Sequence, residues 1–196
     1  DFYSYSTLVD YWNVHYSRVI ENQLDVVHLP FIHRTTIGRG NKTLVNGPVA
    51  KWIDDVLNIW VYNEVDEGQT PKKASELYEV PPPQLKFKYP NVWLNLISKE
   101  IKLIIAFLPI DEENTKLYIR YYQKISKVPL LKEFITWSGK IGSYVIERQD
   151  KRIVETQLPK RSDLKSDENL IPGDRPIVMY RTKRDEMIRL NNKNEN

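Results

Sequence analysis

The apolar positions near the N-terminus fall at the spacing of an α-helix. Between Tyr11 and His28 they are Trp12, Tyr16, Val19, Ile20, Leu24 and Val27. That period puts them on one face of a helix. Pro30 then interrupts the pattern, so we expect the helix to end or kink near His28 or Leu29. The turn-rich segment RTTIGRGNKTLVNGP, residues 34–48, predicts a loop after the helix.

The middle of the chain changes to patterns typical of β-strands. Short runs rich in β-branched and aromatic residues alternate with polar turns such as SKE and DEEN. The runs are KWIDDVLNIWVYNEV (51–65), LKFKY (85–89), NVWLNLIS (91–98), IKLIIAFLPI (101–110) and TKLYIRYYQKI (115–125). Turns this short join neighbouring antiparallel strands, so the pattern predicts an antiparallel meander. The segment EVPPPQ, residues 79–84, predicts a rigid linker or an edge segment.

Helical spacing returns in residues 128–158. Pro129 suits the first turn of a helix, whereas Gly139 and Gly142 are poor helix formers and predict close packing or a bend. Beyond this helix we expect a loop, a short segment and a polar tail, with residues 191–196 disordered. A helix, then strands, then a long helix is the order of an α+β fold with the helix across the sheet. We expect residues 1–190 to form a single domain.

Composition narrows the class of protein. The chain has 196 residues, 41% of them hydrophobic, and a net charge of only +3 with acids and bases interspersed. That size allows one large core, and the charge pattern indicates an ordinary solvated surface and no nucleic-acid partner. No uncharged apolar stretch is long enough to predict a membrane span. There is no cysteine, which excludes disulfides, thiol nucleophiles and an iron–sulfur cluster held by this sequence alone. We expect a cytoplasmic protein.

Two of the three histidines, His28 and His33, stand five residues apart. On a straight helix that spacing separates them by about 140° around the axis. A helix break at Pro30 would let them approach, so a metal site is possible, but the spacing alone favours two separately packed histidines. Imidazole suits Fe, Zn, Cu or Ni, and a carboxylate is the natural third ligand. Spacing alone does not choose among the 26 acidic residues.

Two separated segments resemble the catalytic domain of Rieske non-haem iron oxygenases. ENQLDVVHLPFIH, residues 21–33, is similar to that family's N-x-x-D-x-x-H-x4-H motif. RQDKRIVETQ, residues 148–157, is similar to its Q-D-x-x-[IV]-[IV]-E-x-Q stretch, and LIPGDRPIVMYR, residues 170–181, looks like its closing segment. The matches follow the family's order from Tyr11 to Arg181. They look closest to the vanillate O-demethylase and pheophorbide a oxygenase branch.

The resemblance implies specific site residues. His28, His33 and Asp150 would hold a mononuclear Fe(II), with Glu147 and Glu155 on the same helix as alternative carboxylates. Asp25 matches the aspartate that connects the iron site to the Rieske cluster of a neighbouring subunit, and Asn22 matches a position near the iron, so both are candidate catalytic residues. A carboxylate at Asp25 would also orient His28. The remaining histidine, His15, is interpreted as a surface or packing residue.

The resemblance also implies a fold and an activity. The fold is the helix-grip of Bet v 1 and START domains, a curved antiparallel sheet around a long C-terminal helix. The activity is that of a monooxygenase or dioxygenase that uses O2 to hydroxylate or O/N-demethylate a small apolar, aromatic or polycyclic substrate. Electrons would come from NAD(P)H through a ferredoxin or reductase and a Rieske [2Fe-2S] centre, across a homotrimer.

The sequence departs from complete members of that family because it lacks the cysteines of a Rieske domain. We therefore expect a catalytic fragment whose Rieske domain lies in the same polypeptide or in another subunit, with a natural stand-alone protein as the alternative. Three alternatives stay open: a helix-grip carrier without catalysis, a zinc hydrolase, and a structural subunit with a decayed site. A carrier has no need of the triad, a hydrolase would retain zinc and act without O2, and a decayed site would bind no metal.

Overall fold

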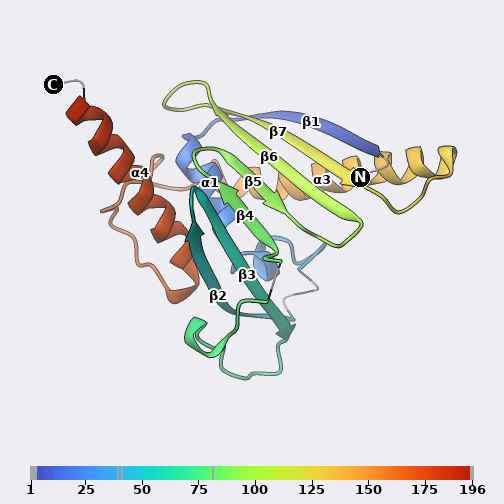
Figure 1. The fold of residues 1–196 in the computed structure, drawn as a ribbon, viewed down its shortest axis with the longest axis horizontal. Helices are drawn as coiled ribbons and strands as arrows, with labels where there is room; N and C mark the ends of the chain where they lie inside the picture. The colour runs from blue at the N-terminus through green and yellow to red at the C-terminus, as the bar shows by residue number, and fades with distance from the viewer. Residues whose placement is uncertain (1–3, 39, 41, 81, 195–196) are drawn as a thin grey trace.

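The computed structural model describes residues 4–38, 40, 42–80 and 82–194. Its centre is one seven-stranded antiparallel sheet with the strand order β1-β7-β6-β5-β4-β3-β2 (Figure 1). The strands are β1 (Ser4–Trp12), β2 (Thr43–Ile53), β3 (Val56–Val65), β4 (Leu85–Lys88), β5 (Val92–Asn95), β6 (Ile101–Pro109) and β7 (Thr115–Gln123). Strands β2 to β6 each pair with the next strand along the chain, which confirms the predicted antiparallel meander.

Helices pack against the sheet and join some of its strands. They are α1 (Tyr16–Leu24), α2 (Leu29–Ile32), α3 (Pro129–Val154) and α4 (Arg175–Asn194), with short 3-10 turns η2 (Ala74–Glu76) and η3 (Pro172–Asp174). The long helix α3 packs along β1 and β7, behind the sheet in the view of Figure 1. This arrangement is the expected α+β helix-grip fold.

The N-terminal helix was predicted too long. Residues Ser4–Trp12 form β1, which pairs with β7 from Ser4 opposite Gln123 to Trp12 opposite Thr115. The apparent helical spacing from Trp12 to Tyr16 spans the junction between this strand and α1. His15 begins α1 as its N-cap, because its Nδ1 accepts a hydrogen bond from Ser17 N at 3.2 Å. It is therefore a buried capping residue.

The loop predicted for residues 34–48 is also too long, because β2 begins at Thr43. The register of β2 against β3 shifts between Asn46 and Val49, and Gly47 there has a φ of 83°. A bulge with a left-handed glycine lets the strand continue through residues that otherwise favour a turn. Gly and Pro in this segment therefore mark an irregularity inside a strand.

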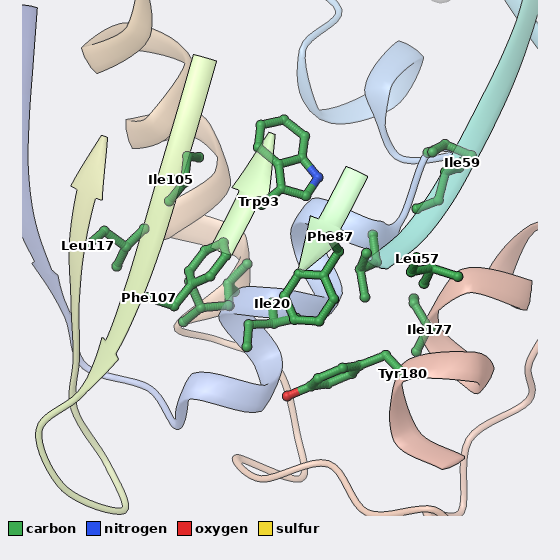
Figure 2. Close-up of a cluster of buried hydrophobic side chains, with 14 of the residues drawn as sticks. Ile20, Leu57, Ile59, Phe87, Trp93, Ile105, Phe107, Leu117, Ile177 and Tyr180 are labelled. Carbon is green, nitrogen blue, oxygen red and sulfur yellow. The ribbon is translucent and has the colours of Figure 1, made fainter. Parts of the chain in front are cut away.

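The hydrophobic core lies between the sheet and the helices α1 and α4 (Figure 2). Phe87 from β4 and Tyr180 from α4 meet edge to face, with their ring centroids 5.5 Å apart. Ile20 from α1, Leu57 from β3 and Phe107 from β6 are fully buried around them. Because the core includes Tyr180, helix α4 is an integral part of the fold.

The C-terminal segment was the least well predicted. Instead of a loop, a short segment and a tail disordered from residue 191, Arg175–Asn194 is one helix of 20 residues. Residues 195 and 196 lie outside the described part of the chain. The buried positions Ile177, Tyr180, Arg181 and Arg184 have helical spacing, but two of them are arginines, which hid the apolar face. In the part of the chain that the structure describes, no helix is both long and apolar enough to cross a membrane.

Candidate metal centre

The two histidines of the motif stand at the two ends of one helical turn. Helix α1 ends at Leu24, and Asp25 Oδ1 then accepts hydrogen bonds from the backbone N of Val27 at 2.8 Å and of His28 at 3.2 Å. This turn starts the four-residue helix α2, with His28 at its N-cap and His33 at its C-cap. The helical structure is therefore interrupted at Asp25, before both histidines. The sequence had predicted an interruption between them.

Pro30 has a different role from the one predicted. It lies in the first turn of α2, where a backbone N–H would have no helical partner, so proline favours the start of that helix. After His33 the chain turns tightly, and Gly38 N donates to His33 O at 2.8 Å. A Cβ at Gly38 would come within 2.6 Å of Leu29 O. Glycine at this position therefore allows the turn that holds His33.

Asp150 on α3 completes a compact cluster with the two histidines. The Nε2 atoms of His28 and His33 are 3.3 Å apart. Asp150 Oδ1 lies 3.1 Å from His33 Nε2 and 3.5 Å from His28 Nε2. The structure thus brings together the three predicted ligands, although Asp150 follows His33 by 117 residues along the chain.

The donor set fits a divalent transition metal. Asp150 Oδ1 is buried and makes no hydrogen bond among the described residues, although two imidazole nitrogens are close to it. An unsatisfied buried carboxylate oxygen is costly unless something charged binds it. Burial lowers the pKa of His33, but the neighbouring Asp150 and Gln149 raise it above its ordinary value. The same carboxylate that attracts a proton to His33 would attract a metal ion.

Gln149 fixes the orientation of His33, and the sequence patterns did not predict this role. Its Oε1 lies 2.8 Å from His33 Nδ1 and also accepts a hydrogen bond from Thr36 Oγ1 at 3.0 Å. With Nδ1 engaged as a donor, His33 presents Nε2 to the cluster. In histidines that bind a metal, the ring nitrogen that does not bind it commonly donates its hydrogen to an acceptor of this kind. The position of Gln149 directly before Asp150 in the motif was the available signal.

Asp25 and Asn22 occupy different surroundings. Asp25 Oδ2 is 3.7 Å from His28 Nδ1, which is buried without a hydrogen-bond partner among the described residues. Asp25 therefore stands beside His28 on the side away from Asp150. Asn22 is partly buried, and its Nδ2 has no hydrogen-bond partner within the described part of the chain. The amide nitrogen of Asn22 is therefore not hydrogen-bonded to the three ligands.

The alternative carboxylates, Glu147 on α3 and Glu155 at its C-cap, lie outside the cluster. Glu155 Oε1 accepts a hydrogen bond from Asn13 N at 2.8 Å. Glu147 Oε1 accepts one from Trp12 Nε1, so it faces β1. Burial and the nearby Asp10 raise the pKa of Glu147 to about 8. Neither glutamate takes the place of Asp150.

An apolar cavity of about 220 Å³ opens beside Asp150, between α3 and the sheet. Its floor is formed by side chains of β6 and β7, and its other walls come from α1, α3 and the end of β1. The lining residues are Trp12, Gln23, Ile97, Leu103, Ile105, Leu117, Ile119, Tyr121, Gly139, Gly142, Ser143, Ile146, Glu147 and Asp150. A mostly apolar cavity with a few polar groups is the usual form of a small-molecule site. The sequence did not identify this lining.

A helix-grip sheet with a two-histidine, one-carboxylate cluster beside an apolar cavity is the arrangement expected of a domain that binds a metal ion and a small molecule. The chain belongs to the family of vanillate O-demethylase oxygenase C-terminal domains, whose model matches residues 12–190. These are catalytic domains of Rieske oxygenases, which are enzymes. Among curated protein sequences, none is similar enough to match.

Solved structures with the same fold include Rieske oxygenases. NdmA of Pseudomonas putida CBB5 has a TM-score of 0.62 and 16% identity, covering 91% of this chain and 48% of its own. NdmB of the same strain has a TM-score of 0.60 and 15% identity, with coverages of 91% and 48%. The quaternary ammonium Rieske monooxygenase CntA has a TM-score of 0.57 and 12% identity, with coverages of 90% and 46%. The chain spans about half the length of these structures.

Proposed function

We propose that this domain binds a mononuclear Fe(II) through His28, His33 and Asp150 and oxidises a small, mostly apolar substrate in the adjoining cavity. The reaction would be hydroxylation or O/N-demethylation with O2. The observation that carries the proposal concerns the buried Asp150 Oδ1. This oxygen lies 3.1 Å from His33 Nε2 and 3.5 Å from His28 Nε2, and it makes no hydrogen bond among the described residues. Family membership indicates that the metal is iron. A ligand set of two histidines and one carboxylate leaves coordination positions open.

When bound, the iron would supply O2 activation. The residues of the chain have supporting roles. Gln149 holds the ring of His33 so that Nε2 points to the metal position. Asp25 holds the backbone of His28 through Oδ1 and faces its Nδ1 with Oδ2, so it would orient that ligand. We also propose that Asn22 lies near the metal, because it matches a motif position that is near the iron.

The substrate would occupy the apolar cavity beside Asp150. Apolar walls exclude water and favour a ligand with little charge. NdmA has been solved with caffeine and CntA with L-carnitine, so related domains accept quite different small molecules. For this chain the cavity favours an apolar, aromatic or polycyclic substrate.

Electrons must come from a centre outside this sequence. A Rieske [2Fe-2S] centre needs cysteine ligands, and the sequence has none. We propose that the cluster belongs to a Rieske domain elsewhere in a longer polypeptide or in another subunit, and that a ferredoxin or reductase delivers electrons from NAD(P)H. In the intact enzyme, Asp25 would connect the two centres across a homotrimer. We propose a cytoplasmic enzyme without nucleic-acid or membrane partners.

The test is anaerobic Fe(II) loading of the full chain, followed by metal analysis by mass spectrometry. We expect about one Fe(II) per chain, lost in Asp150→Asn and in His28→Ala, since each removes one ligand of three. Glu155→Gln, at the C-cap of the same helix but outside the cluster, is the matched control and retains iron. A wild-type chain that takes up no iron, or takes it up regardless of Asp150, contradicts the proposal and favours a carrier. Retention of zinc in preference to iron favours a hydrolase.

A further inference from the structure

A pair of carboxyl groups connects the surface of the molecule with the cavity. Asp10 on β1 has a side chain that is 17% exposed, whereas Glu147 on α3 is 4% exposed and belongs to the cavity lining. The two side chains lie close enough to share a hydrogen bond that shifts the pKa of both. Glu147 precedes Asp150 by three residues, so both lie on one face of α3.

The pair holds one proton at neutral pH. Burial raises the pKa of Glu147 to about 8, and the charge of Asp10 adds to this shift. Burial also raises the pKa of Asp10, but its hydrogen bonds with Glu147, with the backbone of Tyr11 and with Lys151 outweigh that effect and lower it. Lys151 Nζ lies 3.2 Å from Asp10 Oδ2. Asp10 is therefore ionised and Glu147 protonated in the resting protein.

The other charged groups near Glu147 leave this assignment unchanged. Arg148 is exposed, donates its Nε hydrogen to Tyr144 Oη at 3.0 Å and does not line the cavity. Its charge lowers the pKa of Glu147, but burial and Asp10 outweigh that effect. From β7, Tyr121 lines the cavity, and burial raises its pKa above its ordinary value. From α3, Asp150 adds a further negative charge on the same face. Glu147 Oε2 is buried and accepts no hydrogen bond from the described residues.

We propose that Glu147 delivers protons to the cavity beside Asp150 and that Asp10 reloads Glu147 from solvent. This inference rests on the proposed oxygenase function, because that reaction consumes protons: RH + O2 + 2e− + 2H+ → ROH + H2O. The electrons come from the external reductant, one oxygen atom enters the substrate, and the other leaves as water. Each proton passes from the Glu147 carboxyl into the cavity, and Asp10 returns a proton from solvent to Glu147. The apolar walls offer few other donors.

The first test is a pH titration of the metal-free chain followed by tryptophan fluorescence. Trp12 donates its indole N–H to Glu147, so ionisation of Glu147 changes its surroundings. We expect a transition near pH 8 that disappears in Glu147→Gln and moves to lower pH in Asp10→Asn. Glu133→Gln, an exposed glutamate on the same helix, is the matched control and keeps the transition. A transition indifferent to Asp10→Asn overturns the proposed pair.

The second test uses O2 reduction by the iron-loaded chain with ascorbate, O2 + 2e− + 2H+ → H2O2, which needs no identified substrate. General acid catalysis commonly contributes about 100-fold or more, so we expect Glu147→Gln to slow peroxide formation by at least about tenfold and to remove its decline above pH 8. Iron content is measured on the same samples, and its absence in the wild type would refute the oxygenase function separately. An iron-loaded Glu147→Gln chain with the wild-type rate and pH profile overturns the proton-delivery role.

Discussion

At the residue scale, the three candidate ligands and the position of Asp25 beside His28 were predictable, and the contact between Gln149 and His33 was not. The motif match identified His28, His33 and Asp150, and the structure brings their ligand atoms together. The contact of Gln149 with His33 was missed, and Glu147 was considered only as an alternative ligand, because their surroundings depend on which face of α3 meets the cluster and the cavity. A one-dimensional pattern gives the period of that face but not the neighbours it meets.

Gln149 gives a first prediction. Replacing it with leucine removes the acceptor for His33 Nδ1, so the ring loses the partner that orients it. We expect Fe(II) affinity to fall by about 10–100-fold, the usual effect of losing such a partner, while the three ligands remain. Anaerobic competition with a chelator of known affinity measures this. Gln157→Leu, an exposed position beyond the end of α3, is the control, and equal affinities in the two variants would refute the role of Gln149.

His15 gives a prediction on pH. Burial and the charge of Arg184 lower its pKa to about 4 in the folded chain, against an ordinary value of about 6.5 in the unfolded chain. Between these values the unfolded state binds a proton that the folded state does not, so stability falls as pH decreases through this window. We expect His15→Asn, which can still cap α1, to lose this part of the pH dependence. Urea unfolding from pH 7 to pH 4 tests it, and parallel curves for the two proteins contradict it.

At the element scale, two glycines of α3 that look alike in sequence have opposite surroundings. A Cβ at Gly139 would lie 2.3 Å from Tyr121 Cε1, whereas a Cβ at Gly142 meets nothing within 4 Å. The sequence predicted close packing or a bend for both, and close packing holds for Gly139. Helix α3 continues through both positions without a break.

We therefore expect opposite effects from the same substitution. Gly139→Ala should destabilise the fold by about 1–3 kcal/mol, because Tyr121 must move from a packed position. Gly142→Ala should stabilise it by about 0.5–1 kcal/mol through helix propensity. Chemical unfolding of the two variants provides an internally matched comparison. Equal free energies of unfolding would show that the contact with Tyr121 is unimportant.

Helix α4 is held by a buried ionic network that its sequence did not reveal. Glu21 on α1 accepts hydrogen bonds from Arg181 Nε and Nη2, both at 2.8 Å, and from Arg18 Nη1 at 3.1 Å. Glu168 lies 2.7 Å from Nη2 of each arginine. The buried face of α4 contains polar residues, so the segment resembled a polar tail in the sequence. Charged residues can occupy a buried face when they are paired.

Removing the central charge of this network should be costly. Glu21→Gln leaves two buried guanidinium groups undercompensated, and we expect a loss of about 3–5 kcal/mol in the free energy of unfolding. Asp185→Asn breaks an exposed pair with Arg189 on the same helix and should cost less than about 1 kcal/mol. Thermal and urea unfolding measure both. A Glu21→Gln variant as stable as Asp185→Asn would contradict the network's contribution.

At the scale of the whole molecule, the alternating strands and the family motif together predicted the helix-grip fold. Local patterns missed β1 and α4 because their roles come from pairing and packing with distant segments: β1 pairs with β7, and α4 packs against α1 and β2. The cluster of His28, His33 and Asp150 has the same long-range character, since it joins the turn around α2 to α3. Metal binding should consequently stabilise the folded chain.

This coupling can be measured as a shift in thermal unfolding. At a free Fe(II) concentration about 100 times the dissociation constant, binding to the folded state alone adds about 2.7 kcal/mol of stability. We expect an increase in Tm with Fe(II) for the wild type and none for Asp150→Asn. Calorimetric scans under anaerobic conditions follow it. An equal shift in both proteins would place the metal elsewhere.

The most informative experiment on the metal centre is a crystal structure of the Fe(II)-loaded chain with anomalous diffraction recorded at the iron edge. We predict one strong anomalous peak within coordination distance of His28 Nε2, His33 Nε2 and Asp150 Oδ1, facing the apolar cavity. A peak bound by other residues, or no peak at this cluster in crystals whose protein carries iron, would contradict the metal centre and with it the oxygenase function proposed for this chain.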